Sequence, residues 1–333
     1  MKMRVLITIM MLLVAFGVNA QQDVQFSQYV FNGLSVNPAY AGYKEDLYFN
    51  AVYRKQWAGF PGAPQTGAVS LDGLIRNQDN RLGVGGQVTW DKLGPQQTLS
   101  AYGSFAYRIR LDEADTKRLC LGIGFGMNQY SVDGNALKYI DANDPNVPVG
   151  KVSTTKPDAR FGIYYYTPKF YVGASVMDLF SLNSDYKLLF SDGVLYSTIK
   201  KSAHIYLTAG TLITLSDNVK LKPSFMMKED FHGPTNLDLN AFALFAERLW
   251  LGASYRTAVK LWNKEALQPG LQQTAAVSAI MEYYATENMR IGYSYDFTTS
   301  GIASYQAGTH EISIGILIPD KKKLERIKSP RYF

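Results

Sequence analysis

From residue 47 onward, apolar and polar side chains alternate with a period of two, the pattern of β-strands with one apolar face. In 237–245 the odd-numbered positions are apolar or small, and in 308–318 four isoleucines share one face. Most of the strands that this pattern predicts are long enough to cross a bilayer at a tilt. Their fourteen expected ranges are 47–57, 65–76, 81–91, 97–111, 118–130, 158–166, 169–178, 203–215, 219–228, 236–245, 248–257, 272–284, 288–297 and 308–318.

The connections between these strands alternate between short and long. Even-numbered connections such as 77–80, 167–168 and 216–218 are brief and polar, whereas the odd-numbered ones are longer, with 92–96 as the exception. This alternation is typical of short periplasmic turns and longer extracellular loops. The sequence therefore predicts an all-β transmembrane antiparallel barrel of about 14 strands over 47–318, with both termini in the periplasm. A soluble all-β domain is the alternative.

The segment before the first strand, 21–46, fits neither a helix nor a strand. Asn37-Pro38 and Ala41-Gly42 interrupt any regular pattern, yet the segment carries the large side chains Phe26, Tyr29 and Tyr40. Such an aromatic stretch is too apolar for a solvated tail. Since a barrel of this size leaves an interior that its own side chains do not fill, we expect the segment to be a periplasmic N-terminal plug or docking segment.

The two ends of the chain have compositions of their own. Residues 1–20 combine Lys2 and Arg4 with an apolar run and a small-residue cleavage site, which predicts a signal peptide. The formal charge of +6 comes mostly from this peptide and from a basic tail over 319–333, so it does not indicate a nucleic-acid partner. By strand parity the tail is periplasmic, and its basic residues include Lys321, Lys322, Lys323 and Arg326.

The more apolar face of each predicted strand is assigned to lipid, which places the other face in the lumen. The lumen could be solvated and lined by charges that pair across strands, or it could be a selective ion pathway. The ionisable residues expected there are Arg54, Asp72, Arg108, Arg110, Lys220, Lys222, Asp238, Glu282, Arg290, Asp296 and Glu311.

Several glycines fall on the same inner face, in the third to seventh strands. Glycine within a strand costs stability and commonly marks the close approach of another backbone. They could hold an inserted segment, or they could curve the sheet at a barrel corner. These positions are Gly83, Gly85, Gly122, Gly124, Gly126, Gly162 and Gly173.

Signals for catalysis, cofactors and metals are weak. His204, His232 and His310 lie in different segments, and His310-Glu311 lacks the second histidine of a zinc helix. The glycines of 122–126 follow a GxGxG pattern inside a strand with no helix after it, which does not fit a phosphate loop. We expect a non-enzymatic protein without a cofactor.

Three stretches carry a resemblance to a known family. They read FSQY at 26–29, NPAYAG at 37–42 and RKQWAGFPGAP at 54–64, and the late GTHEIS at 308–313 looks like the closing strand of the same family. The chain thereby resembles the PorP/SprF outer-membrane proteins of Bacteroidetes. The residues expected to contact a partner or to form the plug are Phe26, Tyr29, Asn37, Pro38, Tyr40, Gly42, Gln56, Trp57, Gly59, Pro61 and Gly62.

The resemblance implies a role in type IX secretion and gliding motility. It implies as partners either the periplasmic ring and peptidoglycan-associated components or a secreted adhesin with a type B C-terminal signal, which the barrel would anchor at the cell surface. The motifs do not separate these roles. A porin or small-molecule transporter, suggested by the charged inner face, is the alternative function.

Overall fold

The computed structural model describes residues 24–75, 80–137, 148, 150–180, 185–190, 193–261, 264, 276–299 and 304–319. The expected signal peptide and the basic residues of the tail, Lys321, Lys322, Lys323 and Arg326, lie outside the described residues. Among those described, no helix has the length and apolarity that crossing a membrane requires.

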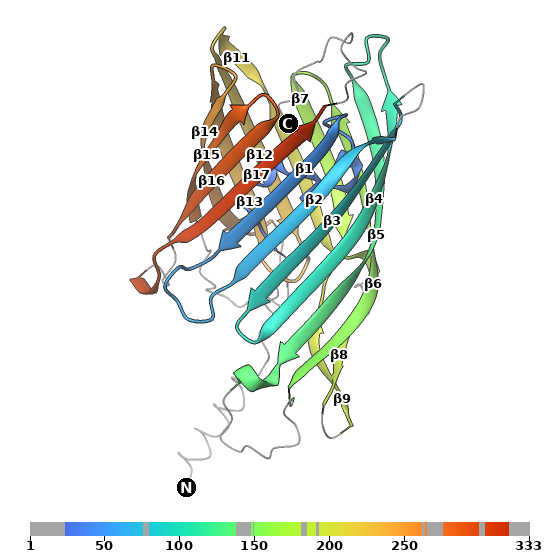
Figure 1. Cartoon of the computed structure of the whole chain (residues 1–333), viewed down its shortest axis with the longest axis vertical. Coiled ribbons are helices and arrows are strands. Elements are labelled where there is room, and N and C mark those ends of the chain that lie inside the picture. The colour runs from blue at the N-terminus through green and yellow to red at the C-terminus, as the bar shows by residue number, and fades with distance from the viewer. Residues whose placement is uncertain are drawn as a thin grey trace.

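The strands form one tilted antiparallel barrel, seen from the side in Figure 1. Neighbouring strands follow one another along the chain, and the barrel closes where the first strand, β1, pairs with the last, β17. The barrel strands described are β1 Leu47–Lys55, β2 Gln65–Ile75, β3 Leu82–Leu93, β4 Gln96–Arg110, β5 Arg118–Asp133, β6 Lys151–Tyr166, β7 Phe170–Met177, β10 His204–Thr211, β11 Ile213–Ser216, β12 Val219–Glu229, β13 Thr235–Phe245, β14 Leu249–Val259, β15 Ala276–Thr286, β16 Met289–Thr298 and β17 Thr309–Ile318.

The prediction of a 14-strand membrane barrel is confirmed. The elements β10 and β11 together occupy the range predicted as one strand, 203–215, and both pair with β12. The strand is interrupted at Leu212, whose backbone N–H donates to the carbonyl of Lys169 at 2.6 Å. The structure also lengthens β6, which begins at Lys151 instead of residue 158.

The two faces of the wall follow the alternation of the sequence. In β13 the side chain of Leu239 is 47% exposed, whereas its neighbour Asp238 is 1% exposed. In β17 Ile312 is 55% exposed and Glu311 is fully buried. At these positions the apolar side chain faces outward and the charged one faces inward, as expected for a barrel in lipid.

The two ends of the barrel differ in their connections. We call the end with the brief connections, such as Asp217-Asn218 and Ala246-Glu247, the turn end, and the opposite one the loop end. Ala246 and Glu247 both have positive φ angles (47° and 56°), as the central residues of a type I′ turn do, and the Arg248 N–H donates to the Phe245 carbonyl at 3.0 Å. At the loop end a separate hairpin, β8 Asp185–Leu189 with β9 Leu195–Lys200, lies beyond the wall near β6 (Figure 1).

Candidate functional site

Residues 24–46 lie inside the barrel, and we call them the lumenal segment. Its regular parts are three short 3-10 turns, η1 Tyr29–Phe31, η2 Gly33–Ser35 and η3 Pro38–Tyr40. Figure 1 shows this part of the chain, in blue, enclosed by the strands. Its aromatic side chains join two buried clusters with side chains of the wall, so the segment supplies the barrel with a packed interior.

The lumenal segment runs along the barrel from the loop half to the turn end. Phe26 packs against Val52 and Ala68 in the loop half, whereas the Gly42 N–H donates to the Asp72 carboxylate, 2.8 Å away, toward the turn end. The sequence predicts a periplasmic plug or docking segment over 21–46. In the structure the segment passes through the lumen before the chain enters β1 at Leu47.

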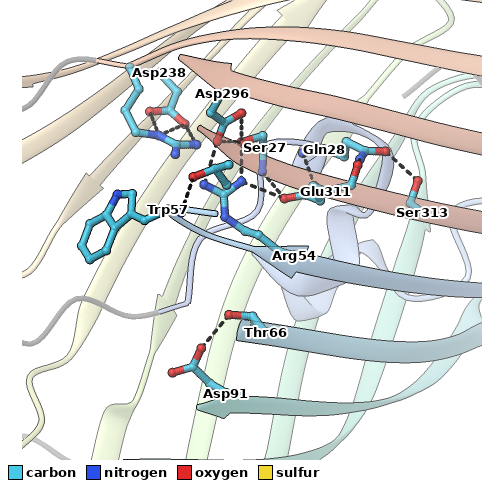
Figure 2. Close-up of polar contacts among 12 residues, drawn as sticks. Ser27, Gln28, Arg54, Trp57, Thr66, Asp91, Asp238, Asp296, Glu311 and Ser313 are labelled. Carbon is cyan, nitrogen blue, oxygen red and sulfur yellow. Dashed lines mark hydrogen bonds and ion pairs between the residues drawn. The ribbon is translucent and has the colours of Figure 1, made fainter. Parts of the chain in front are cut away.

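A buried cluster of charged and polar groups fixes the start of the segment to the wall, and Figure 2 shows it. We call Ser27, Gln28, Arg54, Asp296 and Glu311 the charged anchor. The Glu311 carboxylate accepts the backbone N–H groups of Ser27 (2.9 Å) and Gln28 (2.8 Å). The Arg54 guanidinium pairs with Glu311 at 3.0 Å and with Asp296 at 2.7 Å. The Ser27 hydroxyl also contacts Asp296, at 2.8 Å.

The anchor depends on the closure of the barrel. Arg54 belongs to β1, Asp296 to β16 and Glu311 to β17, and the register places Arg54 directly opposite Glu311. All three side chains are at most 4% exposed. Because a buried charge that loses its partner is costly, these residues hold the segment only as a complete set.

Further charged groups of the inner face also turn toward the segment. Arg290 donates to the carbonyl of Phe31 at 3.0 Å and pairs with Glu282 at 2.5 Å. Asp238 pairs with Arg256 at 3.0 Å. The inner charges thus pair across strands, as one of the two interpretations of the sequence expected, but they are buried against the segment instead of solvated.

The Asn37-Pro38 pair sits on β6 and β7. The Asn37 amide donates to the carbonyls of Ile163 (3.0 Å) and Ala174 (3.3 Å) and accepts from the Ala39 N–H at 2.9 Å. It thereby caps η3, whose first position is Pro38, the place where proline is favoured. One side chain both shapes the segment and binds it to the wall.

The glycines of the inner face lie where the segment comes closest. We call Gly83, Gly85, Gly122, Gly162 and Gly173 the glycine face. A Cβ on Gly122 would lie 2.1 Å from the Ala39 nitrogen, and one on Gly83 would lie 2.0 Å from the Ala41 carbonyl oxygen. A Cβ on Gly85 would lie 3.1 Å from the Leu34 side chain. A Cβ on Gly162 or on Gly173 would lie 2.1 Å or 3.1 Å, respectively, from the side-chain amide of Asn37. These distances leave no room for a larger residue.

Two of the predicted inner glycines do not contact the segment. A Cβ on Gly124 would meet Arg160, Gly103 and Ser104, and one on Gly126 would meet Ala101 and Tyr102. These neighbours all belong to the barrel wall, so Gly124 and Gly126 accommodate packing within the sheet.

Aromatic residues fill the turn half of the lumen. Tyr40 packs edge-on against Tyr164, and Tyr43 packs edge-on against Tyr166, with ring centroids 5.6 Å and 4.8 Å apart. The guanidinium of Arg108, which is fully buried, donates to the Tyr166 hydroxyl at 2.6 Å. Since Arg108 is also 3.5 Å from Glu45, this end of the segment is tied to the wall as well.

The third motif stretch forms a connection at the loop end, and we call residues 56–64 the collar loop. The Ala58 backbone exchanges two hydrogen bonds of 2.8 Å with Ala307 and Gly308, and the Gly94 N–H donates to the Gly62 carbonyl at 3.0 Å. Gly59 (φ 88°) and Gly62 (φ 75°) adopt left-handed backbone that glycine favours. The loop is thus fixed to both neighbouring connections while Gly59, Phe60, Pro61 and Gly62 stay exposed.

A cavity of about 100 Å³ lies in the loop half, between the start of the segment and the wall. Asp178, directly after β7, borders it and lies 3.1 Å from the Lys201 ammonium. Burial alone would raise the pKa of Asp178, but Lys201, His204 and Arg160 hold this pKa well below its ordinary value. Asp178 therefore stays ionised, and its ion pair joins the two ends of the connection between β7 and β10.

Two of the charged residues predicted on the inner face do not lie in the buried lumen. Arg110 is exposed because β4 ends there, and Lys220 pairs with Glu247 at the rim of the turn end.

Three residues that bind the segment or pair with the inner charges were not predicted. Ser27 and Gln28 belong to the FSQY stretch but were given no role. Arg256 could have been found, because the register places it opposite Asp238 on the inner face.

These observations define an outer-membrane β-barrel whose lumen holds the segment that precedes its first strand. A family model described as "Type IX secretion system membrane protein PorP/SprF" matches residues 18–316. The chain belongs to this family, as the motifs led us to expect. No curated protein matches the sequence.

One solved structure supports the fold. The CymD monoaromatic hydrocarbon channel is similar with a TM-score of 0.52 at 13% identity, over 86% of this chain and 92% of that one. A FadL homologue of Pseudomonas aeruginosa is similar with a TM-score of 0.45 at 12% identity, over 90% and 95% of the two chains. At such identities CymD shows the barrel architecture and nothing about a ligand.

Proposed function

We propose that this barrel is a non-enzymatic component of type IX secretion that docks partner proteins. The partners are either secretion-machinery components on the periplasmic side or a secreted adhesin with a type B C-terminal signal, held at the cell surface. The observation that carries the proposal is the lumenal segment. It is bonded to the wall by the charged anchor at its start and by Asn37 and Gly42 further on, so the barrel acts as a rigid scaffold.

In this proposal the turn end faces the periplasm and the loop end faces outward. The contrast in length between the two sets of connections supports this orientation. It places the basic tail after β17 in the periplasm, where Lys321, Lys322, Lys323 and Arg326 would meet acidic partners.

The collar loop supports a partner on the outer side. Its backbone is fixed at three points, yet Phe60 is 43% exposed. An exposed aromatic side chain on a rigid loop is the kind of anchor that protein interfaces use. The family motif over 54–64 covers this loop, so the motif includes residues that the barrel does not need for its core.

An affinity pull-down from solubilised outer membranes, with secretion and gliding assays alongside, tests the proposal. Phe60→Ser changes an exposed apolar residue at the loop end, and Leu111→Ser changes one that is 52% exposed at the turn end. Loss of a secreted adhesin with Phe60→Ser supports the anchoring role, and loss of periplasmic components with Leu111→Ser supports the machinery role. Full secretion, adhesin display and gliding after deletion of the gene would contradict both.

The porin alternative is tested by planar-bilayer conductance. We expect the intact barrel to conduct poorly and a variant lacking residues 24–41 to conduct steadily, because the segment then no longer fills the lumen. A steady open channel in the intact barrel that is unchanged by the deletion would favour a porin over a docking scaffold.

A further inference from the structure

The outer face of the barrel carries a row of basic and polar side chains at the loop end. We call Lys92, Gln65, Lys55 and His310 the basic row. The register pairs Lys92 with Gln65, Gln65 with Lys55, and Lys55 with His310, so the four lie side by side across β3, β2, β1 and β17. These strands are neighbours on the face of the barrel turned to the viewer in Figure 1.

The row lies at the boundary between polar and apolar side chains on the outer face. Two residues closer to the turn end along each strand, the outward positions are Trp90, Gly67, Tyr53, Ile312 and Tyr293. Tyr53 and Ile312 are 44% and 55% exposed, and the next outward pair, Val69 and Val88, is 47% and 48% exposed. Aromatic residues above an aliphatic belt mark the level of the lipid headgroups on membrane barrels.

The charges of the row are uncompensated on this part of the surface. On the outward positions of β1, β2, β3, β16 and β17, the charged side chains described are Lys55 and Lys92, both exposed, and no acidic side chain stands beside them. No ion pair joins either lysine to any residue that the structure describes. The nearby carboxylate of Asp91 points inward, where Thr66 donates to it at 2.6 Å.

The neighbouring polar groups are already arranged. The Tyr293 hydroxyl and His310 Nδ1 are 2.8 Å apart, and the Tyr53 hydroxyl donates to the Gln65 amide oxygen at 3.0 Å. These bonds hold Gln65 and His310 beside Lys55. Since adjacent strands are about 4.8 Å apart, Lys55 and Lys92 lie about 10 Å apart and can converge on one group between them.

We propose that the basic row binds the phosphate of an anionic lipid in the leaflet that faces the loop end. The two ammonium groups pair with the phosphate, while the aromatic residues and the aliphatic belt beneath them contact the rest of the lipid. The site is one-sided: the outward positions near the loop end of β13, β14 and β15, such as Leu237, Tyr255 and Val277, carry no charge. The lipid would therefore lie against β1–β3 and β17 only.

The test is the selectivity of the purified full-length barrel for spin-labelled lipids in phosphatidylcholine nanodiscs. We expect the wild type to prefer phosphatidylglycerol to phosphatidylcholine. Each lysine near a membrane surface contributes about a fivefold preference, so Lys55→Gln should lower it about fivefold and Lys55→Gln with Lys92→Gln should remove it. Arginine at both positions should restore it, because the charge is kept.

A matched control is Lys151→Gln in β6, an outward lysine near the same end. Lys151 donates to the Gln97 amide at 3.3 Å and pairs in register with Asp133, so it already has polar partners. We expect no change in selectivity, and heat-modified gel migration checks that each variant is folded. Equal selectivity in the wild type and the double glutamine variant would overturn the proposal. Displacement of the labelled lipid by inorganic phosphate alone would also overturn it, since the site would then be one for the free anion.

Discussion

Two regions of the same wall hold the lumenal segment by different physical means. On β1, β16 and β17 the charged anchor binds it through ion pairs and hydrogen bonds to backbone N–H groups. On β3, β5, β6 and β7 the glycine face binds it through close backbone contact, with the Asn37 amide as the main polar link. The first region depends on complementary charge and the second on the absence of side chains, so they should fail in different ways.

The largest effect is expected at the charged anchor. Arg54→Met leaves the carboxylates of Asp296 and Glu311 buried without their shared cation. Breaking a buried pair in this way costs about 3–5 kcal/mol, so the free energy of unfolding in detergent should fall by that amount. The control Arg110→Met removes an exposed arginine and should change this free energy by less than about 0.5 kcal/mol.

Loss of the anchor should also expose the segment. Tyr29→Cys, made in a Cys120→Ser background, should be shielded from a bulky thiol reagent because position 29 is buried in the native barrel. The same cysteine should react once Arg54→Met is added. Ready labelling before the anchor is broken would show that the segment leaves the lumen on its own, and the contrast between the two regions would lose its basis.

A smaller effect is expected at the glycine face. Gly122→Ala adds one methyl group 2.1 Å from the Ala39 backbone nitrogen, so either the segment or β5 must shift. Overpacking of this kind costs about 1–3 kcal/mol in the free energy of unfolding. Gly103→Ala is the matched control in the neighbouring strand, because the nearest atom to its Cβ, the Phe125 carbonyl oxygen, is 4.0 Å away. Equal stability of the two variants in urea titrations would show that the glycine face does not bear the segment.

The sequence allowed one of these regions to be anticipated and not the other. Period-two alternation assigns each residue to a face, so the glycines that lie on the inner face could be recognised, together with their two possible roles. The charged anchor joins Ser27 to Glu311 from opposite ends of the chain, and it exists only because β1 closes against β17. Alternation says which face a charge is on, but not which charges meet after closure.

The course of the segment could not be predicted for a related reason. Its aromatic content indicated burial, but neither Asn37-Pro38 nor Ala41-Gly42 encodes a direction through the lumen. That direction is set by contacts with distant strands, such as Gly42 with Asp72 and Asn37 with Ile163. Connection lengths indicate only on which side of the barrel β1 begins, and they carry no information on the path of the residues before it.

The smallest effect is expected at Asn37, which combines both means of attachment. Asn37→Ala removes the cap of η3 and the amide bonds to Ile163 and Ala174, yet it leaves the close contacts of the glycine face in place. Loss of a helix cap costs about 1 kcal/mol, and a neutral hydrogen bond contributes about as much, so the free energy of unfolding should fall by about 1–2 kcal/mol. Urea titration against the exposed control Asn135→Ala measures it. A cost as large as that of Arg54→Met would mean that the second region also depends on polar bonds, and the distinction between the two regions would not hold.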